Sequence, residues 1–154
     1  MKTRSLLIAA AISVAGCMTT TSQPPPERPR ETTCSTKTCE IEVIVTDLTA
    51  SECRISDPGK VNIRTEKDVK ITWKIADASW LAGYVFEPKG IVFEKNPKDE
   101  FYDADRPTLA LGKHFKWHDK NFERGEYKYT IYVKNISPFN GRTCKLDPII
   151  ANQG

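Results

Sequence analysis

The stretch Val69-Lys70-Ile71-Thr72-Trp73-Lys74-Ile75 decides the fold of this chain. Apolar and polar side chains alternate strictly along it, which puts the apolar ones on one face: Val69, Ile71, Trp73 and Ile75. Successive side chains of a β-strand point to opposite faces, so this period predicts a strand with one buried and one solvated face. Such half-buried strands are typical of antiparallel sheets.

Similar short runs occur on both sides of this strand. Residues 41–46 and 127–134 alternate in the same way, and residues 61–63 follow the turn signal Asp57-Pro58-Gly59. No stretch longer than a turn or two has a helical pattern, although residues 119–124 are compatible with a short helix. The sequence therefore predicts an all-β chain, an antiparallel β-sandwich of about seven strands.

A further turn signal lies in the middle of the chain. Glu87-Pro88-Lys89-Gly90 separates the apolar runs 84–86 and 91–93. Proline and glycine in such a gap favour a reversal of the chain, so we expect a hairpin here.

The stretch Gly125-Glu126-Tyr127-Lys128-Tyr129 resembles the Gly-x-Tyr-x-Cys motif in the penultimate strand of immunoglobulin-like domains, with Tyr129 in the cysteine position. It is also similar to the Gly-x-Tyr-x-Tyr-x-Cys strand of cupredoxins. Both resemblances imply a Greek-key sandwich, and the first implies that the Tyr127 hydroxyl bonds to a nearby backbone group. Ile131 stands where cupredoxins have their copper-binding cysteine, so the cupredoxin resemblance does not extend to a blue-copper site.

The N-terminus has the features of an export signal. Lys2 and Arg4 precede an apolar run, residues 6–14, that is shorter than the roughly 20 residues needed to span a bilayer. The run ends in Val14-Ala15-Gly16-Cys17, which resembles the lipobox of bacterial lipoprotein signal peptides. That resemblance implies removal of residues 1–16 and a membrane anchor of acyl chains on Cys17. Met18 then favours the outer membrane, with the protein facing the periplasm.

A spacer is expected to follow the anchor. Residues 17–38 are rich in Thr, Ser and Pro and predict an extended tether, which leaves residues 39–154 as the folded domain. Removal of the signal's Lys2 and Arg4 from the 23 basic residues leaves 21 against 20 acidic residues. A nearly even charge gives no electrostatic support for a nucleic-acid partner.

The cysteine count agrees with this processing. Lipidation of Cys17 would leave four of the five cysteines: Cys34, Cys39, Cys53 and Cys144. In an oxidising compartment these predict two disulfides, and the sequence leaves all three connectivities open. One of them would close a small loop between Cys34 and Cys39 and join Cys53 to Cys144. A zinc site is less well supported because the spacing contains no pair of Cys-x-x-Cys motifs.

The stretch His114-Phe115-Lys116-Trp117-His118 is a candidate metal site. Residues four apart on a strand share a face, so His114 and His118 could bind one metal, with Asp119 as a third ligand or as a carboxylate that orients a histidine. The alternative is a sandwich strand with Phe115 and Trp117 inward and both histidines in solvent. No motif for a nucleophile accompanies the histidines, so we expect neither an enzyme nor a cofactor.

Two further segments have two interpretations each. Residues 98–105 carry four carboxylates, which could hold Ca²⁺ or form a solvated loop. Several aromatic residues either belong to the core or mark a partner-binding surface: Trp80, Tyr84, Phe101 and Tyr102.

Taken together, these features favour a non-enzymatic, outer-membrane-anchored lipoprotein. It would bind an envelope protein or cell-wall component through a strand edge or through loops near Trp80 and Asp103. Two alternatives remain at this point: a periplasmic metal-binding protein that uses His114 and His118, and an inhibitor of a cell-wall-directed enzyme.

Overall fold

The computed structural model describes residues 31–49, 52–65, 67–105, 112–137 and 141–153. The predicted signal peptide, Cys17 and most of the predicted tether lie outside these residues. The described part is all-β apart from one short helix, α1 (Asp77–Leu81), and a 3-10 turn, η1 (Pro97–Asp99). No helix in these ranges is long and apolar enough to cross a membrane.

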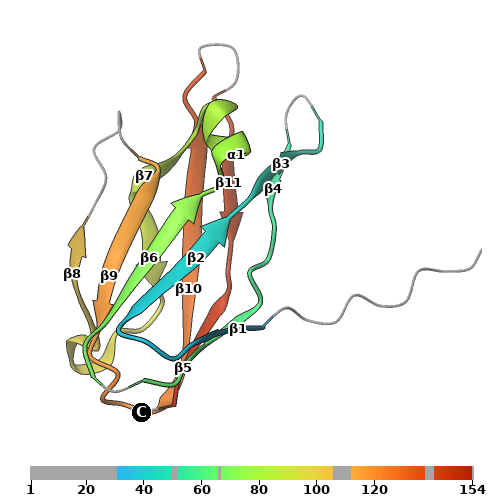
Figure 1. Cartoon of the computed structure of the whole chain (residues 1–154). Coiled ribbons are helices and arrows are strands. Elements are labelled where there is room, and N and C mark those ends of the chain that lie inside the picture. Colours follow the sequence, from blue (N-terminus) through green and yellow to red (C-terminus); the bar gives the residue numbers. More distant parts are fainter. Residues whose placement is uncertain (1–30, 50–51, 66, 106–111, 138–140, 154) are drawn as a thin grey trace, which may run out of the picture.

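The strands form two main sheets and one small ribbon (Figure 1). The six-stranded sheet has the order β1 (Glu31–Cys34), β5 (Lys60–Ile63), β12 (Ile149–Asn152), β10 (Gly125–Asn135) and β11 (Thr143–Leu146), and β7 (Tyr84–Phe93) also pairs with β10. The four-stranded sheet has the order β2 (Thr38–Val43), β6 (Val69–Ile75), β9 (His114–Asp119) and β8 (Phe101–Asp105). The ribbon pairs β3 (Val45–Asp47) with β4 (Cys53–Ile55).

The sequence predicts purely antiparallel sheets, and the structure contradicts this. Strand β5 runs parallel to both β1 and β12, and β2 runs parallel to β6. The N-terminal strands change sheets at the turn between Cys34 and Cys39, so β1 joins one sheet and β2 the other. Alternation of side chains is the same in both kinds of pairing, which is why the pattern did not distinguish them.

The prediction of a hairpin at residues 87–90 is wrong. Residues on both sides of it belong to the single strand β7, which follows β10 with a register shift between Ile131 and Val133. The four residues form a bulge on β7. A Cβ on Gly90 would lie 2.9 Å from the Phe86 Cβ and from a backbone oxygen, so the bulge packs too tightly for a side chain there.

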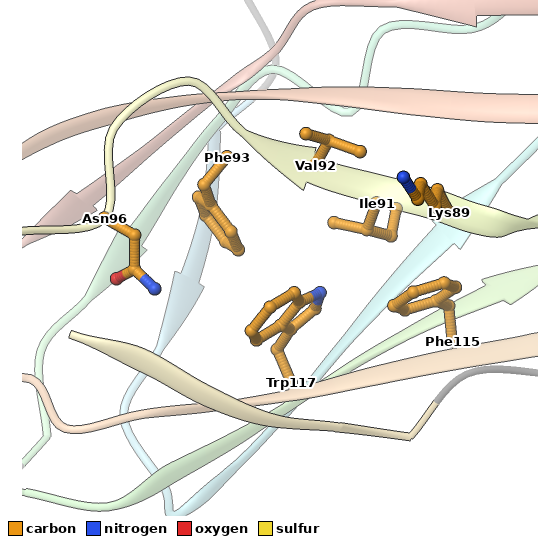
Figure 2. Close-up of a pocket in the computed structure, with 7 residues that line it drawn as sticks. All are labelled: Lys89, Ile91, Val92, Phe93, Asn96, Phe115 and Trp117. Carbon is orange, nitrogen blue, oxygen red and sulfur yellow. The ribbon is translucent and has the colours of Figure 1, made fainter. Parts of the chain in front are cut away.

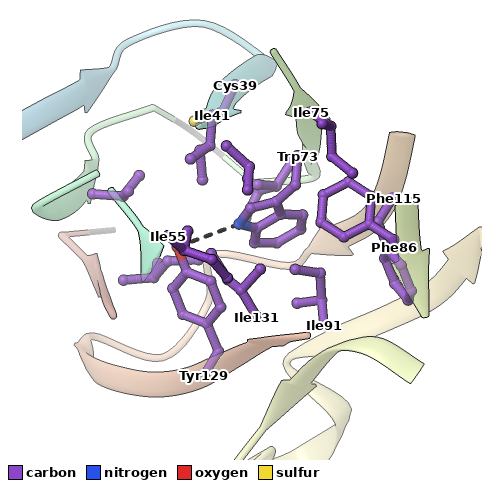
Figure 3. Packing of buried hydrophobic residues seen from close by; sticks show 14 of the residues in the cluster. Cys39, Ile41, Ile55, Trp73, Ile75, Phe86, Ile91, Phe115, Tyr129 and Ile131 are labelled. Carbon is purple, nitrogen blue, oxygen red and sulfur yellow. Dashed lines mark hydrogen bonds between the residues drawn. The ribbon is translucent and has the colours of Figure 1, made fainter. Parts of the chain in front are cut away.

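The inward faces of the two sheets share one buried core (Figure 3). All four apolar residues of β6 are fully buried, as their spacing predicted. Across the core, the Trp73 Nε1–H donates to the Tyr129 hydroxyl at 3.3 Å, and the two rings meet edge to face at 5.4 Å. Burial of each large apolar side chain contributes about 1.5–3 kcal/mol, so this shared core holds the sheets together.

The described ranges contain two disulfides. Cys34 pairs with Cys39, and Cys53 pairs with Cys144 across 91 residues of chain; their Cα–Cα distances are 5.4 and 5.7 Å. The longer bridge joins β4 of the ribbon to β11 of the six-stranded sheet. Because β1 begins at Glu31 and pairs with β5, the folded part begins inside the predicted tether, before residue 39.

The corner before β10 agrees with one prediction and contradicts another. The Tyr127 hydroxyl donates to the Glu123 carbonyl oxygen at 3.0 Å, the backbone bond that the immunoglobulin-like resemblance implied. The helix considered for residues 119–124 does not form. Asn121 has a φ of 45°, and its N–H donates to the Asp119 side chain at 2.8 Å, so the segment is a loop.

Candidate functional site

A recess opens where β7 of one sheet and β9 of the other separate (Figure 2). Ile91 and Phe93 of β7 face Phe115 and Trp117 of β9 across it. Its volume is about 210 Å³, and its remaining lining residues are Lys89, Val92 and Asn96. The recess is thus an apolar slot with a cation at one end and an amide at the other.

The shape of the recess follows from contacts at its two ends. At one end the Phe86 N–H donates to the Gly112 carbonyl at 2.8 Å, which holds β7 beside the segment that leads into β9. At the other end Phe93 stacks on Phe101 with ring centroids 3.6 Å apart. The Asn96 side chain both donates to the Phe101 carbonyl, at 2.6 Å, and accepts from its N–H, at 2.8 Å. The walls are therefore preformed rather than dependent on a ligand.

The Trp117 side chain is half-buried and contributes an unusual polar group. Its ring meets Phe93 edge to face at 5.7 Å, and its indole N–H has no hydrogen-bond partner among the described residues although it is buried. A buried donor without a partner costs about 1–3 kcal/mol. An acceptor on a bound segment would recover that cost.

The edge of β7 beside the recess is the second element of the site. Strand β7 pairs with β10, and no other described strand pairs with it. Val92, on the outward face, keeps 40% of its side chain exposed, and Lys89 is exposed as well. A strand edge carries backbone donors and acceptors, so it can take an extended segment of another chain.

The structure does not assemble the predicted metal site. His114 and His118 share the outward face of β9, with Lys116 between them. Asp119 lies on the opposite, buried face, because residues an odd number apart on a strand point to opposite sides; its prediction as a third ligand is wrong. In the described part of the chain, no three His, Cys, Asp or Glu side chains gather to hold a metal.

The electrostatics around His114 also oppose cation binding. Its pKa is lowered by burial and by the nearby ammonium groups of Lys113, Lys74 and Lys116. Lys74 is its direct neighbour on β6, and Lys70 is the corresponding neighbour of His118. This face of the sheet is thus a solvated, lysine-rich surface, and Phe115 and Trp117 point inward as the alternative interpretation predicted.

The predicted partner-binding aromatics separate into two kinds. Tyr84 and Phe101 are 1% exposed and belong to the core, so their prediction as surface residues is wrong; their strands direct them inward. Trp80 is half-buried and packs against the core. Tyr102 is half-buried on the outer face, near His118, with ring centroids 5.5 Å apart. The sequence did not point to the recess, although it placed Trp117 on the inward face.

The acidic run 98–105 is neither a solvated loop nor a cation loop. Residues 101–105 form β8, with Asp103 and Asp105 exposed, whereas Glu100 is 1% exposed. Glu100 Oε1 accepts from the Asn152 side chain at 3.2 Å, and the same amide donates to Asp119 at 3.0 Å. The two carboxyl groups thus meet inside the protein.

This buried pair has a clear electrostatic consequence. Burial raises the pKa of Asp119 to about 7, and the neighbouring Glu100 charge acts in the same direction. Asn152 lies on β12 and Asp119 on β9, so the hydrogen bond between their side chains links the two sheets. Asp119 continues the inward period of Phe115 and Trp117, which is the signal that could have revealed its burial.

No protein-family model matches this chain, and no curated protein matches it significantly.

Proposed function

We propose that this protein is a non-enzymatic binding module of the bacterial cell envelope, anchored in the outer membrane through lipidated Cys17 and facing the periplasm. Its domain is proposed to be a Greek-key sandwich of the immunoglobulin-like or cupredoxin-like kind. The lipobox-like stretch Val14-Ala15-Gly16-Cys17 supports the anchor, and the Tyr127 backbone bond supports the immunoglobulin-like form.

One observation carries the binding function: the edge of β7 lies directly beside a preformed apolar recess. An extended segment of an envelope protein would pair with this edge through its backbone, which supplies affinity. One of its apolar side chains would enter the recess lined by Ile91, Phe93, Phe115 and Trp117, which supplies specificity. A carbonyl of the same segment would accept the Trp117 N–H.

The partner is best sought by photo-crosslinking in cells that make the full chain. A benzoylphenylalanine at Val92 should give a defined adduct, and the same group at Lys145, exposed on β11, should not. A photo-crosslinker at position 89 should also give an adduct. Val92→Lys should reduce the yield of that adduct, because a lysine on a strand edge opposes strand pairing. Equal labelling from Val92 and Lys145 would reject this binding mode.

The anchor is tested separately, so that the two parts of the proposal can fail independently. Metabolic labelling with a radioactive fatty acid should mark the protein and should be lost in Cys17→Ser. When the cells are fractionated, the Cys17→Ser variant should be absent from the outer-membrane fraction. Labelling that persists in Cys17→Ser would contradict the anchor and leave the β7 site untouched.

A further inference from the structure

A second pocket lies at the end of the molecule where β9 ends and β10 begins, near the end labelled C in Figure 1. Its volume is about 460 Å³, larger than that of the recess beside β7. Its walls come from three separate turns of the chain and include Lys37, Thr65, Lys67, Asn121, Phe122 and Arg124.

The charge of this pocket differs from that of the chain as a whole. Lys37 and Lys67 contribute two ammonium groups, Arg124 also lines the pocket but has an interaction partner of its own, and Asp68 is the single carboxylate among the described lining residues. Asp68 already accepts a hydrogen bond from the Tyr102 hydroxyl at 3.0 Å. The chain beyond the predicted signal is close to neutral, so this local excess of positive charge favours an anionic ligand.

An exposed aromatic ring lies among these cations. Phe122 is 61% exposed, and the Lys67 ammonium lies 4.5 Å from the centre of its ring. The Phe122 N–H donates to buried Glu100 at 2.7 Å, which fixes the backbone that presents the ring. A large apolar ring held in water contributes nothing to the core, and it offers a flat surface to the C–H face of a sugar.

The wall beside the ring adds a hydrogen-bond acceptor. Asn121 is 3% exposed; its amide group donates to the Thr65 carbonyl, and its Oδ1 has no partner among the described residues. A buried acceptor without a partner is costly, and a hydroxyl group would satisfy it. A ligand with hydroxyl groups, a flat C–H face and an anionic group matches the acceptor, the ring and the cations together.

We propose that this pocket binds an anionic saccharide, a sugar that carries a phosphate or a carboxylate. The ammonium groups of Lys37 and Lys67 take the acidic group, Phe122 packs against the sugar ring, and Asn121 accepts a hydroxyl. This site is separate from the β7 recess and does not depend on it.

The test uses the full chain in neutral detergent, titrated at low salt and followed by isothermal calorimetry. Glucose 1-phosphate and glucuronate should bind, whereas glucose and inorganic phosphate should each bind at least about tenfold more weakly, because each lacks one half of the contacts. Raising the salt concentration should weaken the binding of both charged sugars.

Variants decide whether binding occurs in this pocket. Phe122→Ala and Lys67→Ala should each lower the affinity for both charged sugars by about tenfold. Leu81→Ala, at a side chain that is 84% exposed on α1, and Lys145→Ala serve as matched controls and should leave the affinity unchanged. Both test residues are exposed, and unchanged circular dichroism would show that the variants fold.

Several outcomes would overturn the proposal. Absence of binding by both charged sugars would reject the site, and unchanged affinity in Phe122→Ala would place the ligand elsewhere. Equal affinity for inorganic phosphate and glucose 1-phosphate would remove the saccharide from the assignment. Equal affinity for glucose would remove the anionic group. None of these results bears on crosslinking at Val92, so the proposed function stands or fails by its own experiment.

Discussion

Replacement of Asp119 by Asn should stabilise the protein at neutral and alkaline pH. Asp119 is fully buried, and its Oδ1 accepts from the Asn121 N–H at 2.8 Å and from the Asn152 amide at 3.0 Å. An Asn side chain of the same shape keeps both bonds through its own oxygen. Its amide group supplies the donor that only the protonated acid could offer to Glu100.

The magnitude follows from the pKa of Asp119, which is raised from 3.8 to about 7 by burial. Below pH 4 both folded and unfolded chains carry the proton, so the group does not change the free energy of unfolding. Between pH 4 and 7 the unfolded chain releases the proton while the folded protein retains it, and stability falls as pH rises. Above pH 7 the loss is complete; the pKa difference corresponds to about 4 kcal/mol.

The assay is urea denaturation at pH 4.5 and pH 8, followed by tryptophan fluorescence. The free energy of unfolding of Asp119→Asn should equal that of the parent within about 1 kcal/mol at pH 4.5. At pH 8 it should be larger than that of the parent by about 2–4 kcal/mol. Asp103→Asn is the same change at an exposed position of β8. Its free energy of unfolding should stay within about 0.5 kcal/mol of that of the parent at both pH values. A variant that is less stable than the parent at pH 8 would refute the reasoning.

Three further predictions concern the fold. Replacing Cys53 and Cys144 together by Ser should lower the free energy of unfolding by about 4–5 kcal/mol, because the bridge closes 91 residues of chain; a denaturation curve checks this. Tyr129→Phe should cost about 1–3 kcal/mol by the same method, because it leaves the buried Trp73 N–H without its acceptor. Gly90→Ala should cost about 1–3 kcal/mol and lower the melting temperature, because its Cβ would lie 2.9 Å from a backbone oxygen and a side-chain carbon.

Sequence reasoning succeeded where one physical rule decides the outcome. The inward faces of β6 and β10 follow from the period of two, and Tyr127, Tyr129, Ile131 and Val133 are all buried as predicted. It failed where several structures satisfy the same pattern. Parallel and antiparallel neighbours produce the same alternation, and residues 87–90 have the composition of a tight turn although they form a bulge.

The candidate sites were harder to predict than the strands. The period of β9 places Trp117 inward, but the recess exists because two sheets separate beside it, and no local pattern records that separation. Lys37, Lys67 and Phe122 are distant in sequence and meet because three turns share one end of the molecule. An exposed Phe122 has no distinguishing neighbour in the sequence. The period of β9 does extend to Asp119, so a buried acid was within reach of the same argument.

One short segment, residues 96–101, supports both candidate sites. Asn96 and Phe101 hydrogen-bond to each other at the end of the recess, and Phe101 stacks on its Phe93 wall. Between them in sequence, Glu100 accepts from the Phe122 N–H and so holds the loop that presents the ring of the basic pocket. Burial is the main cause of the raised pKa of Asp119, and the charge of the nearby Glu100 carboxylate adds to it. The part of the cost that Glu100 adds is therefore a consequence of how the Phe122 loop is positioned, since a binding loop needs a rigid support.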